Sequence, residues 1–266
     1  MRLDSPAMFF IPEIDWRWTQ VVTLIFLVLG PLTFLNETRG AKQMGYSKFA
    51  RPDARKSVPS RVGMFIVYFP AALAPAAALA FSGVTATGWH WLAMGLVTAH
   101  FAKRCAEVLF LHRYSGRMDL DAVVPICLQY TLQSVTLAWI ACVENPLGPP
   151  GETFPVALRV GMVLWGLGTS LNLYHHWLLS RLRKDGAGGY HLPRGGLFGW
   201  VACPHYFGEL VAWFGFALVF HHITALVFFS TMLLYLMGRS SATLSWYREK
   251  LTTTPEGWRR LIPLVY

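Results

Sequence analysis

Charged side chains are scarce in this sequence. Asp, Glu, Lys and Arg make up 14% of the 266 residues, whereas 54% are hydrophobic and 15% are aromatic. Soluble domains usually carry about 25% charged residues. The shortage excludes an ordinary soluble globular domain and favours an integral membrane protein.

Cysteine is also rare, and its spacing does not suit a metal centre. The four cysteines, Cys105, Cys127, Cys142 and Cys203, form no C-x-x-C pair and lie in apolar stretches, where a buried thiol behaves as a small apolar residue. The start of the chain lacks the short apolar core and small-residue cleavage site of a secretory signal. We therefore expect no disulfide framework, no bound metal and no cleaved leader.

Long apolar runs recur at lengths that can cross a bilayer, roughly 17–25 residues each. Seven spans are predicted, at 19–36, 62–82, 89–111, 122–142, 155–180, 197–219 and 222–238. Only the stretch HHIT separates the last two, so one broken hairpin is the alternative there. No internal repeat or second domain is evident, and we expect residues 1–266 to form a single all-α, multi-pass membrane domain.

Lys and Arg are confined to alternate connections between these spans. The connection after the first span holds seven of them, and the C-terminal tail holds five, whereas SGVTATG, ENPLGPPGETF and HHIT hold none. By the positive-inside rule, the N-terminus lies outside and the tail lies in the cytoplasm. The net charge of +9 is therefore a topology signal, and its scatter along the membrane edges argues against nucleic-acid binding.

Polar residues gather in the third span, although charges inside a bilayer are costly and usually have a partner or a function. In AHFAKRCAEVLFLHRY, the residues His100, Lys103 or Arg104, and Glu107 share one helical face. A Lys103–Glu107 ion pair is the simplest explanation. Four polar groups exceed the needs of one pair, which favours a functional cavity.

The fifth span ends in LNLYHHWLLSRLRKDGAGGYHLPRGG, where Asn172, His175 or His176, and Arg183 share a face running toward the cytoplasm. Adjacent histidines diverge by about 100° on a helix, so they are poorly placed to chelate one metal. The glycine-rich turn at 185–196 has neither GxGxxG nor GxxxxGK[ST] order. Its basic residues suit phosphate groups, and a plain basic loop is the alternative.

The stretch ACPHYFGE opens the sixth span. Pro204 suits the first turn of a helix. His205 and Glu209 are four residues apart and face the same way, while Tyr206 lies about 100° round the helix; a structural His205–Glu209 hydrogen bond is the alternative. Together with the third and fifth spans, this stretch predicts a pocket that opens toward the cytosol.

From about His100 to Tyr266, the chain resembles the steroid 5-alpha-reductase and trans-2-enoyl-CoA reductase superfamily. The resemblance rests on LNLYHHWLLSRLRKDGAGGYHLPRGGLFGWVACPHYFGELVAWFGFAL and on the closing RRLIPLVY. It implies a seven-helix membrane fold that holds NADPH on its cytoplasmic side. The implied reaction delivers a hydride to a C=C bond conjugated to a carbonyl.

The resemblance also implies which residues contact the cofactor. By position these are Asn172, His176, Arg183, His191, His205, Glu209, Arg239 and Tyr247. His176, His191 and Thr243 stand where the steroid branch usually has other residues, and Arg183 is implied as a phosphate partner.

Three residues are candidates for catalysis. A proton donor near the carbonyl oxygen lowers the barrier as negative charge develops there. The enoyl-CoA branch implies Lys103 and Tyr206 as the catalytic pair, from HFAKRCAEVLFLHRYS and CPHYFGE. The steroid branch has a glutamate where this chain has Tyr68 and a tyrosine where it has Phe101, which makes Tyr68 the alternative donor.

We therefore expect NADPH-dependent reduction of a conjugated C=C bond in a lipid, with a trans-2-enoyl thioester as the favoured substrate. The first alternative is a 3-oxo-5-alpha-steroid 4-dehydrogenase acting on 3-oxo-4-ene steroids, and a polyprenol-type substrate is a smaller one. An isoprenylcysteine-type membrane methyltransferase and a non-enzymatic membrane receptor or scaffold are more remote. The membrane is the endoplasmic reticulum in a eukaryote or the inner membrane in a bacterium.

Overall fold

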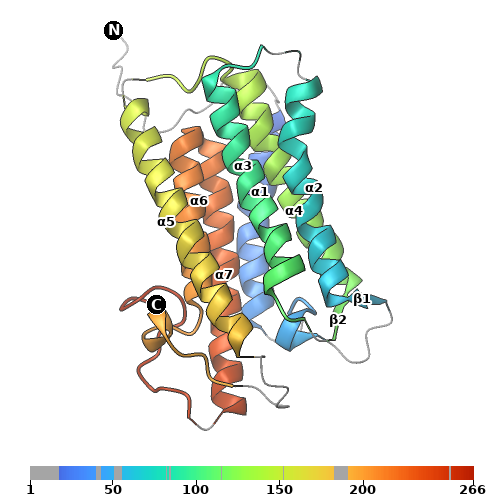
Figure 1. Cartoon of the computed structure of the whole chain (residues 1–266), viewed down its shortest axis with the longest axis vertical. Helices are drawn as coiled ribbons and strands as arrows, with labels where there is room; N and C mark the ends of the chain where they lie inside the picture. Colours follow the sequence, from blue (N-terminus) through green and yellow to red (C-terminus); the bar gives the residue numbers. More distant parts are fainter. Residues whose placement is uncertain are drawn as a thin grey trace.

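A bundle of long helices runs along the molecule (Figure 1). The computed structural model describes residues 18–39, 43–50, 56–81, 83, 85–114, 116–151, 153–182, 191–251 and 253–266. Within these ranges there are seven long helices: α1 Trp18–Thr38, α2 Ser60–Phe81, α3 Gly88–Ala106, α4 Leu120–Trp139, α5 Phe154–Arg181, α6 Pro204–Phe220 and α7 Ile223–Lys250. They lie at the seven predicted stretches.

Five of these helices are long and apolar enough to cross a membrane: α1, α2, α4 with its π-helical extension to Glu144, α5 and α7. Large apolar side chains on them are exposed, among them Leu24, Val28, Leu128 and Leu167. Helices satisfy their backbone polar groups internally, so such a surface suits a lipid environment. The architecture is that of an all-α membrane protein.

The helices pack in neighbouring groups, with α5 against α6, α1 against α7, and α2 against α3 and α4. Glycines bring the backbones of α5 and α6 into contact. A Cβ atom at Gly208 would lie 2.6 Å from the backbone nitrogen of Asn172, and one at Gly161 would lie 2.8 Å from the carbonyl oxygen of Gly215. Small residues allow such close approach in membrane helices, and here they place Asn172 beside the first turn of α6.

The sixth and seventh helices are separate. His221, in the left-handed conformation with φ 49°, ends α6, and the His222 side chain accepts a hydrogen bond from the Thr224 backbone N–H at the start of α7. The alternative of one broken hairpin is therefore wrong, because α6 and α7 are two distinct helices. The sixth helix also begins later than predicted, at Pro204, because a 3₁₀ turn at Gly196–Gly199 precedes it.

Helix α7 is longer than predicted. The predicted span ends at residue 238, but α7 continues to Lys250. Arg239 consequently lies inside a continuous helix. This difference arises because the C-terminal tail covers the extension: Trp258 packs on Tyr247, and the Tyr266 hydroxyl is 2.9 Å from Ser241 Oγ.

The short strands lie at one end of the bundle, the same end as the C-terminus (Figure 1). β1 (Ser57–Pro59) pairs antiparallel with β2 (Arg117–Asp119), with Ser57 opposite Asp119. This pair ties the start of α2 to the start of α4. Residues 43–50, which contain the 3₁₀ turn Ser47–Phe49, join the same end through the hydrogen bond from the Asp119 N–H to the Gly45 carbonyl.

Candidate active site

A cavity of about 330 Å³, hereafter the central cavity, lies among the helices. Its apolar lining comes mainly from α2, α4 and α7, and includes Met64, Ile126, Met232 and Leu236. Its polar lining comes from α5, α6 and the far half of α7, and also from residues 43–50, Arg104 on α3 and residues 112–114. One cavity therefore joins a polar side to an apolar side.

Most of the predicted site residues line this cavity. They are Tyr68, Asn172, His176, His191, His205, Tyr206, Glu209 and Tyr247. Lys103 and Arg239 do not line it, and Arg183 lies outside the described residues.

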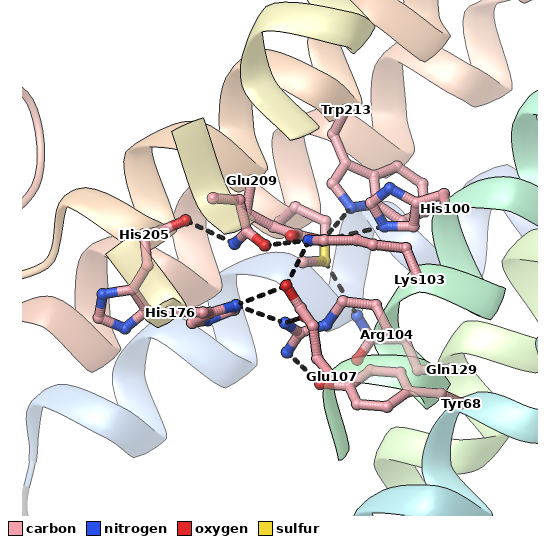
Figure 2. Close-up of polar contacts among 12 residues, drawn as sticks. Tyr68, His100, Lys103, Arg104, Glu107, Gln129, His176, His205, Glu209 and Trp213 are labelled. Atoms are coloured by element: carbon pink, nitrogen blue, oxygen red, sulfur yellow. Dashed lines mark hydrogen bonds and ion pairs between the residues drawn. The ribbon is translucent and has the colours of Figure 1, made fainter. Parts of the chain in front are cut away.

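Lys103 and Arg104 share the carboxylate of Glu107, next to the polar side of the cavity (Figure 2). The Lys103 ammonium is 3.1 Å from Glu107 Oε1, and the Arg104 Nη1 is 2.5 Å from Oε2. Lys103 also donates to the side-chain oxygen of Asn172, and His176 Nδ1 lies 3.2 Å from Glu107 Oε1. The predicted Lys103–Glu107 pair is thus confirmed, but it is part of a larger cluster that binds α3 to α5.

Glu209 is held by α3 and not by its helical neighbour His205. Its Oε1 lies 3.1 Å from His100 Nε2 and accepts a hydrogen bond of 3.1 Å from Trp213 Nε1. The alternative interpretation, a structural His205–Glu209 hydrogen bond, is wrong, because Glu209 makes this interhelical contact instead. His205 instead accepts a hydrogen bond at its backbone oxygen from Asn172, and its buried Nδ1 has no hydrogen-bond partner within the described part of the chain.

Tyr68 is held by an arginine that the sequence did not assign to the site. Arg104 Nη2 donates a 2.7 Å hydrogen bond to the Tyr68 hydroxyl oxygen, and both residues line the central cavity. Arg104 is visible in the polar stripe of α3. The sequence around Arg104 does not indicate that Tyr68 of α2 contacts it, because Tyr68 and Arg104 are 36 positions apart.

Arg239, expected as a cofactor contact, supports one wall of the cavity from behind. It is fully buried and lies 2.9 Å from the carboxylate of Glu37 on α1. It also donates to the backbone oxygens of Met44 and Tyr46 and lies over the Tyr46 and Phe49 rings. The guanidinium therefore fixes residues 43–50.

Residues 43–50 contribute side chains to the cavity that sequence reasoning missed. Tyr46 lines it and is hydrogen bonded to the Tyr235 hydroxyl at 2.5 Å. Lys48 also lines it, with its ammonium 4.1 Å from the centre of the Tyr247 ring. No local motif identifies this segment, since only tertiary contacts bring it to the cavity.

One group of side chains has the composition of a metal site. Ligand atoms of Glu107, His112 and His176 lie within 4.8 Å of one another. The Arg104 guanidinium, however, contacts both Glu107 and His176, and a fixed cation there opposes a second one. The chemistry of the group favours an ion-pair cluster.

The fold and the cavity together define a helical membrane protein with a buried ligand site that is part polar and part apolar. A sequence model of the family described as 3-oxo-5-alpha-steroid 4-dehydrogenase matches residues 118–266. The chain belongs to this family. It is an enzyme, an oxidoreductase that acts on a CH–CH group with NADP as the acceptor.

Individual relatives extend the similarity beyond the region that the family model matches. The human 3-oxo-5-alpha-steroid 4-dehydrogenase 1 is 31% identical over 229 residues, which cover 83% of this chain and 86% of the human one. The human 3-oxo-5-alpha-steroid 4-dehydrogenase 2 is 28% identical and covers 85% of this chain and 89% of its own. A steroid 5-alpha-reductase of Gossypium hirsutum is 39% identical over 116 residues, or 43% of this chain and 45% of its own. Each of these relatives is named for a steroid substrate.

Proposed function

We propose that this protein reduces the C=C bond of a 3-oxo-4-ene steroid or a close structural analogue, with NADPH as the hydride source. The observation that carries the proposal is the division of the central cavity into a polar and an apolar side. A hydride transfer needs both a dinucleotide and an apolar enone in one enclosed space. The names of the relatives support the steroid, so we now favour it over the enoyl thioester that the sequence suggested.

The polar side of the cavity fits a dinucleotide. It combines amide, carboxylate, hydroxyl and imidazole groups with a cation, and His205 Nδ1 is a buried polar atom without a partner among the described residues. The residues proposed to hold the cofactor directly are Asn172, His176, His191, His205, Glu209 and Tyr247, and Arg183 is proposed as a phosphate partner. When bound, NADPH supplies the hydride.

Arg239 serves the cofactor through residues 43–50. It holds the segment whose Lys48 lies beside Tyr247. We infer that Lys48 joins the cofactor-binding residues, because a lysine on a pocket wall is suited to a phosphate as a point charge.

The apolar side fits a flat, rigid lipid. Met64, Ile126, Met232 and Leu236 provide an apolar surface, and Tyr68 is the phenol on α2 that reaches it. Tyr68, Tyr206 and Lys103 are the proposed catalytic set. Lys103 acts through Glu107 and Asn172, to which it is bound, so its part is to position the network around the substrate.

The proposed setting is a membrane crossed seven times, with the N-terminus outside and the polar end of the bundle in the cytoplasm. That end carries the basic connections and the C-terminal tail. The substrate then enters from the lipid phase and NADPH from the cytosol. The membrane is the endoplasmic reticulum in a eukaryotic cell or the inner membrane in a bacterial one.

The test is a product assay with the purified protein in detergent. It is given NADPH with either a panel of 3-oxo-4-ene steroids or a panel of trans-2-enoyl-CoAs, and saturated products are identified by mass. We expect NADPH oxidation coupled to saturated steroid. Reduction of the thioesters alone would show that the substrate is an enoyl thioester. Binding of S-adenosylmethionine in place of NADPH would show that the protein is not a reductase.

A further inference from the structure

Tyr68 and Arg104 form a direct contact between a phenol and a cation on the cavity wall. Their hydrogen bond is 2.7 Å long, and Arg104 Cζ lies 4.7 Å from the centre of the Tyr68 ring. Tyr68 is 5% exposed. The Tyr68 phenol is therefore buried in the cavity wall, where electrostatic contacts are stronger than in bulk water.

Arg104 is held in one orientation by other contacts. Its Nη1 binds Glu107 Oε2 at 2.5 Å and lies 2.9 Å from His176 Nδ1, while its Nη2 is left to Tyr68. Lys103 shares the same carboxylate. Two cations thus face one carboxylate, so the Glu107 charge does not cancel the positive charge offered to Tyr68.

The direction of the Tyr68–Arg104 bond follows from the chemistry of the two groups. A guanidinium has five donors and no acceptor, so the Tyr68 oxygen accepts this bond. Its own O–H hydrogen is not used on Arg104, and no other described residue accepts it. The Tyr68 proton is therefore available to a group inside the cavity.

We propose that Tyr68 and Arg104 act as one proton-donating pair, in which Tyr68 protonates the substrate carbonyl oxygen and Arg104 stabilises the phenolate left behind. This inference rests on the proposed function. Tyr68 is the catalytic residue of the pair, and Arg104 is its positioning residue.

Hydride addition at the β-carbon breaks the C=C π bond and moves an electron pair onto the carbonyl oxygen. The Tyr68 O–H bond breaks, and its proton forms a new O–H bond there, which gives an enol. Water then protonates the α-carbon, and the hydroxide that this leaves takes the enol O–H proton. A proton from the solvent returns the Tyr68 phenolate to a phenol. The substrate gains one hydride and one proton.

Tyr206, the cavity phenol that the enoyl-CoA branch implies as the donor, lacks this support. Its ring lies 4.2 Å from that of His205, and its hydroxyl receives no hydrogen bond from a cation in the described part of the chain. Lys103, expected to assist it, is bound to Glu107 and Asn172. A phenolate at Tyr206 would therefore have no hydrogen-bonded cation among the described residues to stabilise it.

The test compares the binding of two ligands that differ by one oxygen, a saturated 3-oxo steroid and the same steroid without that oxygen, both in the presence of NADP⁺. One hydrogen bond to the ketone is worth about tenfold in affinity, so the wild type should prefer the ketone by about that factor. Tyr68→Phe and Arg104→Met should abolish the preference while leaving affinity for the deoxygenated ligand unchanged. The matched control is Tyr174→Phe, an exposed phenol on α5, which should keep it.

Turnover and cofactor binding complete the test. Tyr68→Phe should lower kcat by at least about 100-fold, Arg104→Lys should lower it less, and the double variant should be no worse than Tyr68→Phe alone. NADPH affinity should stay within about threefold in each.

One result would contradict the role of the Tyr68–Arg104 pair, and a different result would contradict the proposed function. If Tyr68→Phe keeps both the ketone preference and turnover while Tyr206→Phe loses them, the donor is Tyr206 and the pair is structural, although the protein is still a steroid reductase. If the wild type itself neither binds NADPH nor reduces a steroid, the proposed function fails.

Discussion

Arg239 and Glu37 form a buried ion pair that joins α7 to α1. The pair also holds residues 43–50, which line one wall of the central cavity. Each side chain is 1% exposed, and the Glu37 carboxylate also accepts a hydrogen bond from the Met44 backbone N–H. Removing one partner of such a pair leaves a buried charge uncompensated, which typically costs about 3–5 kcal/mol. The pair therefore stabilises both the bundle and the segment 43–50.

We expect Glu37→Gln to lower the thermal unfolding temperature in detergent and to weaken NADPH binding about tenfold, because residues 43–50 lose their anchor. The matched control is Lys250→Gln, which removes an exposed ion pair with Glu249 and should change neither quantity. Thermal shift and cofactor titration measure the two effects. Unchanged NADPH binding in a destabilised Glu37→Gln variant would show that the segment does not contribute to the cofactor site.

His112, just beyond the third span, should make stability depend on pH. Burial, together with the neighbouring His176 and Arg104, lowers the pKa of His112 to about 2, whereas an unfolded histidine has a pKa near 6.5. The unfolded chain then binds a proton that the folded protein does not. Stability should fall as pH drops below about 6.5, by at most about 1.4 kcal/mol per pH unit.

Unfolding temperatures measured between pH 7.5 and pH 5 test this dependence. His112→Gln, which cannot titrate, should flatten the slope. An equal slope in the variant would assign the dependence to other groups.

Among the elements, the α5–α6 pair is the one on which the polar side of the cavity depends. Gly208 lies where a Cβ atom would meet the backbone of Asn172, and Gly161 and Gly215 meet farther along the same two helices. Helices in lipid associate through close packing more than through the hydrophobic effect. Separating this pair would also separate Asn172 from the His205 carbonyl that it binds at 2.8 Å.

Gly208→Ala should therefore lower stability and cofactor affinity together, with a loss of about 1–3 kcal/mol from overpacking. Gly166→Ala on α5 is the control, because a Cβ there has no neighbour within 4 Å, and it should be neutral. Thermal shift and NADPH titration again report the outcome. A neutral Gly208→Ala would mean that the two helices are not as close as described.

At the scale of the whole molecule, the connections without Lys or Arg and the C-terminal tail should lie on opposite sides of the membrane. Leu147 is 94% exposed at one end of the bundle, and Glu256 is exposed in the tail at the other. Leu147→Cys and Glu256→Cys provide one reactive thiol at each end. The four native cysteines form no disulfide within the described part of the chain, and three of them are buried.

An impermeant thiol reagent added to intact cells should label Leu147→Cys and spare Glu256→Cys, which reacts only after the membrane is opened. The unmodified protein gives the background. Labelling of both variants from the same side would contradict an odd number of spans between residues 147 and 256.

The sequence by itself determined the class of the protein, the positions of its helices and its family. These properties are local: apolar runs, the distribution of Lys and Arg, and one long signature can all be read without knowing which helices touch. The same local patterns placed Asn172 in the fifth span and His205, Tyr206 and Glu209 at the start of the sixth, and those residues line one cavity.

Only the tertiary structure decided how the site is assembled. It placed residues 43–50 on the cavity wall and paired Arg239 with Glu37. It also hydrogen bonded Lys103 to Asn172 and Arg104 to Tyr68. These contacts depend on how each helix is rotated and which neighbour it meets. Residue spacing defines the face of one helix, but it contains no information about the helix on the other side.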